Sequence, residues 1–245
     1  MLLFYLRHGD PIYHPDSLTE LGKKQADALA KRLINSKIDE IYSSDSVRAM
    51  QTAKPTADAY GKKITLLPWA NEHEAWTRMT VKTKDGTPWG YAEKNTANKY
   101  ISKEVRALDK KWFTHPCFDG TKYEEFSISK FEEFDNVINK NVDDFLLSLG
   151  YEHLRDENRY RVINDNQKRV AFFAHHGMGM SILSSILDIP YPMFATHFDL
   201  SHSSMTVISF KNVDGYCIPK ILQLSNDSHL YKEDLLTGYN NVIEF

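Results

Sequence analysis

Two histidine-glycine pairs each follow a short apolar run of this sequence. The first, at His8, comes soon after residues 2–6, and the second, at His176, comes soon after residues 170–174. A short continuous apolar run is typical of a buried parallel strand, and open α/β sheets bind ligands where such strands end. A lone histidine in this position is more often structural, but two at the ends of two strands indicate a shared site.

Arginines accompany these histidines. Arg7 is next to His8, and Arg48 lies in the first turn of a helix expected over residues 46–60, where backbone N–H groups and the helix dipole favour an anion. Two guanidinium groups suit a tetrahedral oxyanion, because each donates two charge-assisted hydrogen bonds. The same cations would repel a divalent metal, and a zinc site would need a third or fourth ligand. The residues therefore predict a bound phosphate, with no metal and no cofactor.

The elements that position these residues follow from the apolar pattern. Residues 2–6 predict a first, central strand, and the capping-box spacing from Ser17 to Glu20 predicts a helix with Leu21 and Leu29 on its buried face. Further strands are expected over residues 38–43, 64–67, 170–174, 205–210 and 218–224, and further helices over residues 46–60, capped by Ser44 and Asp45, and after His176. A turn-rich link joins the last two strands, which favours an antiparallel edge pair.

The middle of the chain has a different character. From about residue 76 to residue 161, charged residues and scattered aromatics dominate, and helices are expected over residues 92–112 and 128–149. Aromatic side chains at such spacing more often form the core of a subdomain than line a pocket for an apolar substrate group. The side chains in question are Trp89, Tyr91, Tyr100, Trp112, Phe113 and Tyr123. We therefore expect a helical insertion with its own aromatic core.

The sequence predicts a single α/β domain over residues 1–245. Its fold class is a three-layer α/β/α arrangement with a mostly parallel central sheet, an antiparallel edge and a helical insertion. The core comprises about residues 1–75 and 162–245, and the insertion comprises about residues 76–161. With 245 residues, 42% of them apolar, the chain is long enough to bury such a core.

Composition argues against several classes of partner. A net charge of −3 and a pI near 6.4 give no overall field that would attract nucleic acid or an anionic membrane. Residues 2–6 are too few for a signal segment or a membrane span. Cys117 and Cys217 lack the spacing of a disulfide framework or a zinc cluster, so a reducing cytoplasm is expected. The sequence does not predict the oligomeric state.

Several segments resemble the histidine phosphatase superfamily, also called phosphoglycerate mutase-like. Leu6-Arg7-His8-Gly9 is similar to its opening signature, residues 18–26 to its first helix, and residues 43–53 to its second arginine motif. Ala174-His175-His176-Gly177 is similar to its second histidine motif, and residues 225–230 to its closing segment. Only about residues 74–161 resemble nothing specific in the family.

The resemblance implies a role for each matching residue. His8 would attack phosphorus, and Arg7, Arg48 and His176 would hold the phosphoryl oxygens, with Gly177 beside them in the substrate-binding group. A nucleophilic histidine needs one unprotonated ring nitrogen, while its other N–H is held by a hydrogen bond such as one to a backbone carbonyl. His176 fits a cationic or donor role that stabilises charge on the transferred group.

A carboxyl group must protonate the leaving alcohol. Residues 69–73 resemble the segment that supplies this group in the family, which makes Glu72 the expected acid and Glu74 its rival. An acid that donates a proton near neutral pH needs a raised pKa, and burial near Trp69 or Trp76 would supply it through desolvation.

The remaining histidines are expected in supporting roles. His175 stands where the family commonly has a small polar residue, and we expect it to be non-catalytic. His229, in the closing segment, is expected to pack against or orient the first motif. His202 and Ser203 are expected in a loop near the entrance of the site.

The expected function is hydrolysis of phosphate monoesters through a phosphohistidine intermediate, with a small phosphorylated metabolite as the partner. Residues 10–16 form a shorter loop than the one that mutases of the family use on phosphoglycerate, so a phosphatase is favoured over a mutase. A mutase would also have to retain its intermediate and exclude water. A non-catalytic phospho-ligand sensor is a further alternative, against which the two histidines and two arginines argue. A metallophosphatase is weaker still, and the sequence does not identify the metabolite.

Overall fold

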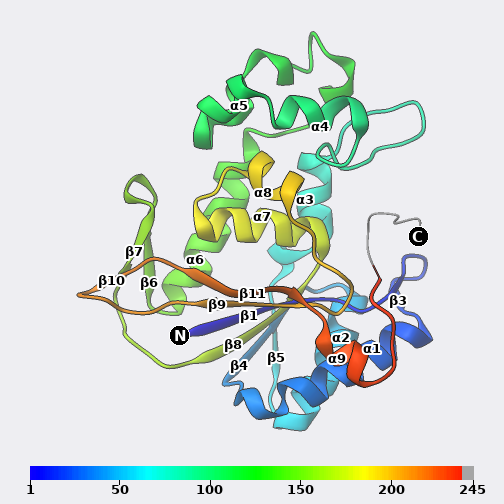
Figure 1. The fold of residues 1–245 in the computed structure, drawn as a ribbon, viewed down its shortest axis with the longest axis vertical. Helices are drawn as coiled ribbons and strands as arrows, with labels where there is room; N and C mark the ends of the chain where they lie inside the picture. The colour runs from blue at the N-terminus through cyan, green and yellow to red at the C-terminus, as the bar shows by residue number, and fades with distance from the viewer. Residues whose placement is uncertain (239–245) are drawn as a thin grey trace.

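A six-stranded sheet lies at the centre of the computed structural model, which describes residues 1–238 apart from the side chains of residues 134 and 135 (Figure 1). The strand order is β11-β9-β1-β8-β4-β5. The strands are β1 (Leu2–Arg7), β4 (Glu40–Ser43), β5 (Ile64–Leu66), β8 (Arg169–Ala174), β9 (Met205–Ser209) and β11 (Lys220–Asn226). β1, β8, β4 and β5 are parallel, whereas β9 is antiparallel to both β1 and β11. This arrangement confirms the predicted fold class.

Side chains of β1 alternate between two apolar cores, one on each face of the sheet. Leu3 and Tyr5 belong to one core, whereas Phe4 and Leu6 belong to the other. All four side chains are buried. A strand that is covered on both faces explains why residues 2–6 are continuously apolar instead of alternating with polar residues.

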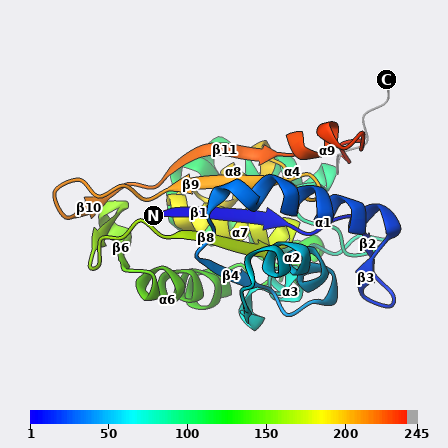
Figure 2. The same ribbon diagram turned by 90° about the horizontal axis from the view of Figure 1, so that it is seen from below.

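Helices cover both faces of the sheet (Figures 1 and 2). One layer contains α1 (Glu20–Leu33), α2 (Val47–Tyr60) and α9 (Ser228–Lys232). The other layer contains α3 (Glu72–Met79), α6 (Lys140–Ser148) and α7 (His176–Leu187). Helix α7 packs on β1, and α3 packs on α7. The loops that follow the parallel strands therefore meet the first turns of several helices.

The first helix begins later than the capping-box spacing predicts. Ser17 is not its cap, because it pairs in a short hairpin of β2 (Pro11–Ile12) and β3 (Ser17–Leu18). Thr19 caps α1 instead, with its side chain accepting a hydrogen bond from the first turn. Leu21, which the pattern placed on the buried face, is exposed.

The second helix is also capped one or two residues later than predicted. The cap is Ser46, whose Oγ accepts a hydrogen bond from the N–H of Ala49 at 3.3 Å. Ser44 and Asp45 precede it. The hydroxyl of Ser44 is instead directed at the ring of His175, so a residue expected to cap a helix supports the site.

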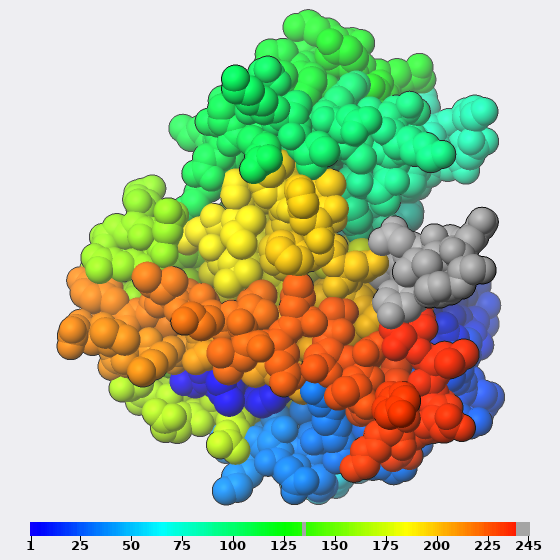
Figure 3. Space-filling view, in the orientation of Figure 1, coloured from blue at the N-terminus to red at the C-terminus, as the bar shows by residue number. Residues whose placement is uncertain are grey.

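The insertion contains short turns in place of the helix predicted over residues 92–112, whereas residues 134–148 are helical within the helix predicted over residues 128–149. Its elements are α4 (Lys94–Tyr100), α5 (Lys103–Ala107), η3 (Asp109–Thr114), η4 (Pro116–Phe118), η5 (Glu124–Phe126) and the π-helical η6 (Phe134–Asn139). Trp112, Phe118 and Phe131 pack ring against ring at its centre, with centroids 5.0 to 5.5 Å apart. The chain breaks into short turns because it wraps around this cluster. In the space-filling view the insertion (green) forms a lobe next to α7 and α8 (Tyr191–His197), which are yellow (Figure 3).

A β-hairpin follows α6 and was not predicted. Its strands are β6 (Tyr151–Leu154) and β7 (Arg159–Val162), and β10 (Tyr216–Cys217) pairs with β7. Charged residues dominate this stretch and obscured its strand pattern. The remaining described elements are η1 (Ile34–Ser36), η2 (Pro68–Ala70) and η7 (Arg155–Glu157).

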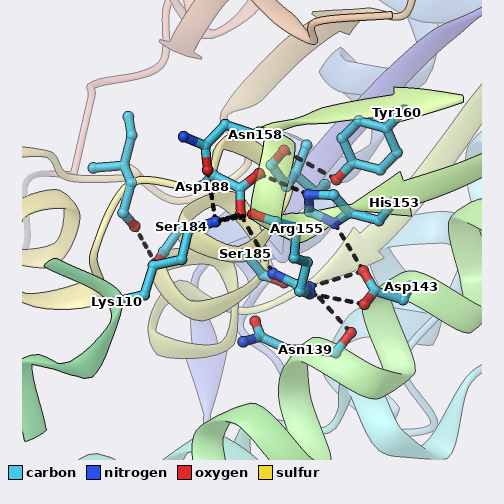
Figure 4. A network of polar contacts seen from close by, with 12 residues as sticks. Lys110, Asn139, Asp143, His153, Arg155, Asn158, Tyr160, Ser184, Ser185 and Asp188 are labelled. Atoms are coloured by element: carbon cyan, nitrogen blue, oxygen red, sulfur yellow. Dashed lines mark hydrogen bonds and ion pairs between the residues drawn. The ribbon is translucent and has the colours of Figure 1, made fainter. Parts of the chain in front are cut away.

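An ionic network joins the insertion to the sheet domain (Figure 4). His153 of β6, whose side chain is fully buried, contacts Asp143 of α6 at 2.8 Å and Asp188, just after α7, at 2.7 Å. Lys110 of η3 pairs with Asp188 at 2.9 Å, and Arg155 pairs with Asp143 at 2.8 Å. Segments far apart in the sequence are thus held together by one buried imidazole and its two carboxylate partners.

Candidate active site

Five of the predicted residues line one cavity of about 960 Å³. Arg7 ends β1 and His8 follows it, whereas Arg48, Glu72 and His176 lie in the first turns of α2, α3 and α7. The cavity is therefore built at the carboxyl ends of parallel strands, as expected for this class of sheet. Its other lining residues are Tyr13, His14, Asn71, His73, Trp76, Trp89, Tyr91, Ala92, Ala195, Thr196, Phe198 and Asp199.

The ring of His8 is buried and held in one tautomer. Its Nδ1 lies 2.7 Å from the carbonyl oxygen of Gly9, and since a carbonyl only accepts, Nδ1 carries the proton. Burial, together with the nearby His175 and Arg7, lowers the pKa of His8 well below its usual value. Nε2 is therefore unprotonated at neutral pH, which is the state that a nucleophile needs.

Helices α1 and α2 hold the loop after β1 in place. A Cβ at position 9 would come within 2.6 Å of the backbone oxygen of Gly22, so Gly9 permits a close approach of α1. The Gly9 N–H donates to Oγ1 of Thr52 at 3.0 Å, and the Asp10 N–H donates to Oε1 of Gln25 at 2.7 Å. Side chains of α1 and α2 thus set the path of the loop.

His175 lies beside His8 and outside the cavity lining. The two ring centroids are 5.2 Å apart in an edge-to-face arrangement. Nε2 of His175 lies 2.8 Å from Oγ of Ser44 and 3.3 Å from Oγ of Ser46. Burial, reinforced by Arg48, lowers the pKa of His175 well below its usual value. A neutral, fully buried ring in this place fits the supporting role predicted for it.

Both arginines are oriented by protein groups. Arg7 donates to the carbonyl oxygen of Leu200, and its Nη2 lies 2.7 Å from Nε2 of His202. Burial lowers the pKa of His202 to about 3, so this ring accepts from the guanidinium. Nη1 of Arg48 forms an ion pair with Asp16 at 2.7 Å. His202 is therefore a direct neighbour of the predicted anion site and not simply a residue at its entrance.

Glu72 accepts two hydrogen bonds from the start of α7. Oε1 accepts from the N–H of Gly177 at 2.9 Å, and Oε2 accepts from the N–H of Met178 at 2.7 Å. These two backbone N–H groups hold the carboxyl group of Glu72 in place. Glu74, the rival acid, instead pairs with Arg78 at 2.9 Å and is not among the lining residues of the cavity. Of the two glutamates, Glu72 is the one that lies in the cavity.

Gly177 combines two structural tasks. Its N–H anchors Glu72, and a Cβ at this position would lie 2.3 Å from the ring of Trp89. A side chain here would therefore displace the indole. Because its N–H is already donated to Glu72, the placement of Gly177 in the substrate-binding group stays a prediction.

The ring of His176 is held from both sides. Its Nε2 lies 2.6 Å from Oδ1 of Asp199, and its Nδ1 lies 3.1 Å from the hydroxyl of Tyr91. Burial raises the pKa of Tyr91 well above its usual value, so this hydroxyl stays protonated. Because both ring nitrogens already have protein partners, donation from His176 to a phosphoryl oxygen stays a prediction.

The closing segment supports the His8 loop through Ser203. Nε2 of His229 lies 3.0 Å from Oγ of Ser203, whose backbone N–H donates to the carbonyl oxygen of His8 at 3.0 Å. Burial lowers the pKa of His229 to about 4, so its ring is neutral at neutral pH. This chain of contacts is the orienting arrangement expected of His229.

Tyr5 connects the two histidine motifs. Its hydroxyl donates to the carbonyl oxygen of His175 at 2.7 Å and lies 3.3 Å from the N–H of the same residue. β1 and β8 are also paired directly, with Arg7 opposite Ala174. The loops after these two strands therefore share a backbone framework.

Sequence reasoning missed the acidic and phenolic partners of the site. Asp16 contacts Arg48, which is 32 positions away in the sequence. His176 contacts Tyr91 and Asp199, which are 85 and 23 positions away. Such separations carry no local signal, because the pairs form only when the sheet and its helices assemble.

The prediction for the aromatic residues of the insertion was partly wrong. Trp89 and Tyr91 line the cavity, whereas Tyr100 and Trp112 are buried in the core as expected. Phe113 packs partly buried against the core, and Tyr123 is exposed. Periodicity alone could not separate the two groups, since it reports burial and not which cavity a ring faces.

The described residues contain no cluster of three or more His, Cys, Asp or Glu side chains that could hold a metal ion. Cys117 and Cys217 are free thiols. Within residues 1–238, no helix has both the length and the apolar character needed to cross a membrane.

Comparison with known proteins supports the family resemblance. Residues 3–116 match the family model of the histidine phosphatase superfamily (branch 1). The matched segment contains Arg7, His8, Arg48 and Glu72, whereas His176 lies beyond it.

Part of the chain is similar to proteins described as probable phosphoglycerate mutase GpmB. The protein from Yersinia enterocolitica is 37% identical over 95 residues, which are 35% of this chain and 44% of that protein. The protein from Yersinia pestis is 42% identical over 82 residues, which are 29% of this chain and 38% of that protein. The chain thus spans less than half the length of these curated relatives.

Solved structures are similar over nearly the whole chain. Mycobacterial glucosyl-3-phosphoglycerate phosphatase in complex with VO3 has a TM-score of 0.55 and 18% identity, covering 91% of this chain and 97% of that one. Phosphoserine phosphatase from Entamoeba histolytica in complex with 3-phosphoglyceric acid also has a TM-score of 0.55 and 18% identity, covering 94% and 98%. At this identity the likeness concerns the fold.

The family-model match covers the first histidine, both arginines and Glu72, and the solved structures share the fold over nearly the whole chain. Residues 3–116, less than half of the chain, are therefore similar to the histidine phosphatase superfamily (branch 1).

Proposed function

We propose that this protein hydrolyses phosphate monoesters through a phosphohistidine formed on His8. One observation carries the proposal: Nδ1 of His8 donates to the Gly9 carbonyl oxygen, which leaves Nε2 with a lone pair in a cavity lined by Arg7 and Arg48. A neutral imidazole beside two guanidinium groups can attack phosphorus while the cations hold the phosphoryl oxygens.

In the first step, Nε2 of His8 forms a bond to phosphorus as the bond from phosphorus to the leaving oxygen breaks. The leaving oxygen takes a proton from the carboxyl group of Glu72, and an alcohol departs. Arg7, Arg48 and His176 stabilise charge on the phosphoryl oxygens during this transfer. The anchor of Glu72 on the α7 N-terminus keeps the carboxyl group in the cavity.

In the second step, water attacks the phosphohistidine. Glu72, now ionised, takes a proton from the water as the new P–O bond forms and the P–N bond breaks. Inorganic phosphate leaves, and His8 and protonated Glu72 are restored. The same residue thus serves as acid and then as base.

The loop of residues 10–16 favours hydrolysis over transfer of the phosphoryl group to a second phosphoglycerate. Residues 10–16 fold mainly as the β2–β3 hairpin, and its tip places Tyr13 and His14 in the cavity wall. Tyr13 is exposed, so this wall is in contact with solvent. A mutase must instead keep water from its phosphoenzyme.

The proposal includes a metal-independent mechanism and a small phosphorylated metabolite as substrate. Two guanidinium groups in the cavity disfavour a divalent cation at the phosphoryl position, because like charges repel. The two free thiols fit a reducing compartment, which supports the cytoplasm as the place of action. Activity that persists in excess EDTA is the expected result for this mechanism.

The test is turnover of para-nitrophenyl phosphate by the wild type and by His8→Ala, with a denaturing quench of the wild type at alkaline pH to trap a phosphorylated peptide. We expect an acid-labile, base-stable phosphohistidine at position 8, and a loss of turnover of about 10³-fold or more in the variant. His197→Ala is the matched control, because it changes an exposed histidine that does not line the cavity.

Three outcomes would overturn the proposal. A His8→Ala variant that keeps a tenth of wild-type turnover would rule out this nucleophile. Binding of vanadate without turnover of any ester would indicate a sensor. A trapped phosphoenzyme that passes its phosphate to phosphoglycerate faster than to water would indicate a mutase.

A further inference from the structure

The active-site cavity is much larger than a phosphate group, and aromatic side chains form a large part of its lining. We propose that the natural ester carries a flat aromatic or other apolar group on its leaving alcohol and no carboxylate. This inference rests on the proposed hydrolysis at His8 and specifies the substrate class of the same site. Its evidence is the position, exposure and charge of the side chains around the cavity.

Three aromatic rings form a continuous wall. The centroids of Trp76 and Trp89 are 5.0 Å apart in a T-shaped arrangement, and those of Trp89 and Tyr91 are 6.1 Å apart with an interplanar angle of 21°. All three residues line the cavity. Rings in these arrangements present both faces and edges to a bound ring.

This aromatic wall lies next to the acid, on the side where the leaving group must be. Glu72 and Trp76 are one turn apart on α3, so both project from the same face of the helix. Trp89 packs against the backbone of Gly177, whose N–H anchors the Glu72 carboxyl group. An alcohol that receives its proton from Glu72 therefore departs beside the indole rings.

The mouth of the cavity exposes large apolar side chains. Trp76 is 38% exposed and Phe198 is 42% exposed, and both line the cavity. Exposed apolar surface at a concave site marks a place where a ligand or partner is bound. An apolar leaving group would remove this surface from water, whereas a small polar one would leave it exposed.

The charges of the cavity disfavour a leaving group with a carboxylate. Among residues 1–238, Arg7 and Arg48 are the only lysine or arginine residues that line the cavity, and both belong to the phosphoryl end. Beyond the reacting groups, Asp199 is the one acidic residue of the described part of the chain that lines the cavity, and it contacts His176. A carboxylate next to Trp76 would lose hydration without gaining a lysine or arginine partner.

The test compares three primary alkyl esters, so that the reactivity of the leaving group is matched. These are 2-(2-naphthyl)ethyl phosphate, ethyl phosphate and 3-phosphoglycerate. We expect kcat/KM of the wild type for the naphthyl ester to exceed that for each of the others by about tenfold or more, a size typical of discrimination in an apolar pocket.

Variants assign this preference to the aromatic wall. Trp76→Ala should lower the ratio of kcat/KM for the naphthyl ester to that for ethyl phosphate by about tenfold, and Trp76→Phe should restore much of it. Tyr231→Ala is the matched control, because this tyrosine is 89% exposed and outside the cavity. It should leave the ratio unchanged.

The outcomes separate this inference from the proposed function. If the ethyl ester and para-nitrophenyl phosphate are hydrolysed but 3-phosphoglycerate is preferred to the naphthyl ester, only the inference on the substrate class fails. An unchanged ratio in Trp76→Ala likewise rejects the aromatic wall as its cause. If no ester is hydrolysed and no phosphoenzyme forms, the proposed function itself fails, and the inference with it.

Discussion

Oδ1 of Asp199 accepts a hydrogen bond from Nε2 of His176 at 2.6 Å, so the loop after α8 orients the second histidine of the cavity. We expect Asp199→Asn to lower kcat for alkyl phosphates by about tenfold or more, because a neutral amide supports a donor or cationic imidazole less well than a carboxylate does. Steady-state kinetics together with the dissociation constant of vanadate checks this. Asp85→Asn, which changes an exposed carboxylate of the insertion, should have no effect. Equal activity of Asp199→Asn and the wild type would show that this carboxylate has no part in catalysis.

Replacement of Glu72 by Gln tests the proton donor through the leaving group. The variant should slow hydrolysis of ethyl phosphate by about 10²- to 10⁴-fold, since an alkoxide needs protonation as it leaves. para-Nitrophenyl phosphate should be slowed far less, because nitrophenolate is stable without a proton. Glu74→Gln is the control on the same helix. Equal slowing of both esters by Glu72→Gln would assign the acid elsewhere.

The buried network between the insertion and the sheet domain should contribute strongly to stability (Figure 4). Asp188 is almost fully buried; burial acts to raise its pKa, but hydrogen bonds from His153 and Lys110 outweigh burial and bring it below its usual value. We expect Asp188→Asn to lower the free energy of unfolding by about 3 kcal/mol, because it leaves a buried charge without its partner. Urea denaturation measures this.

The control for this experiment is a carboxylate on the adjacent helix. Asp144 pairs with Lys140 at the surface, where both side chains are well exposed. Asp144→Asn should therefore change the free energy of unfolding by less than about 0.5 kcal/mol. Similar effects of the two substitutions would refute a special contribution of the buried network.

Buried neutral histidines should make the protein less stable as the pH falls. The pKa values of His8 and His175 lie well below the usual value, and those of His202 and His229 are about 3 and about 4. Between the ordinary histidine pKa of about 6.5 and these folded-state values, the unfolded chain binds protons that the folded chain does not. Each such histidine therefore lowers the free energy of unfolding by about 1.4 kcal/mol per pH unit as the pH falls.

Urea denaturation at pH 7, 6 and 5 measures this dependence. His229→Gln should reduce its slope by about 1.4 kcal/mol per pH unit at the acid end, since one proton fewer is taken up on unfolding. His197→Gln, which changes an exposed histidine, should leave the slope unaltered. A wild-type stability that is constant from pH 7 to pH 5 would contradict the proposed neutral state of the buried rings.

The sheet and the reacting residues were predictable because they depend on local pattern. The apolar run of residues 2–6 predicts a strand that is buried on both faces. His8 and His176 each follow such a strand, which predicts that they lie together at the carboxyl edge of the sheet. The helix caps were less predictable, because Ser17 and Ser44 are used by neighbouring segments instead of by the helix that follows each of them.

The rest of the site depends on contacts that form only in the assembled fold. Asp199 reaches His176 from a separate loop, and Trp89 reaches the start of α7 from the insertion. Neither has a spacing that would single it out among the aspartates and aromatics of the chain. The positions of His8 and His176 could therefore be predicted from the apolar runs that precede them. Their partners could not, because those contacts form only in the packed fold.

The hydroxyl of Tyr5, which contacts both the N–H and the carbonyl oxygen of His175, ties the end of β1 to the end of β8. The rings of His8, the proposed nucleophile, and of His176 consequently have their spacing fixed by the fold itself. The conformational entropy of bringing them together is lost when the chain folds and not when an ester arrives. Under the proposed mechanism, interactions with the ester can then favour the geometry of phosphoryl transfer, because the groups that contact it are already positioned.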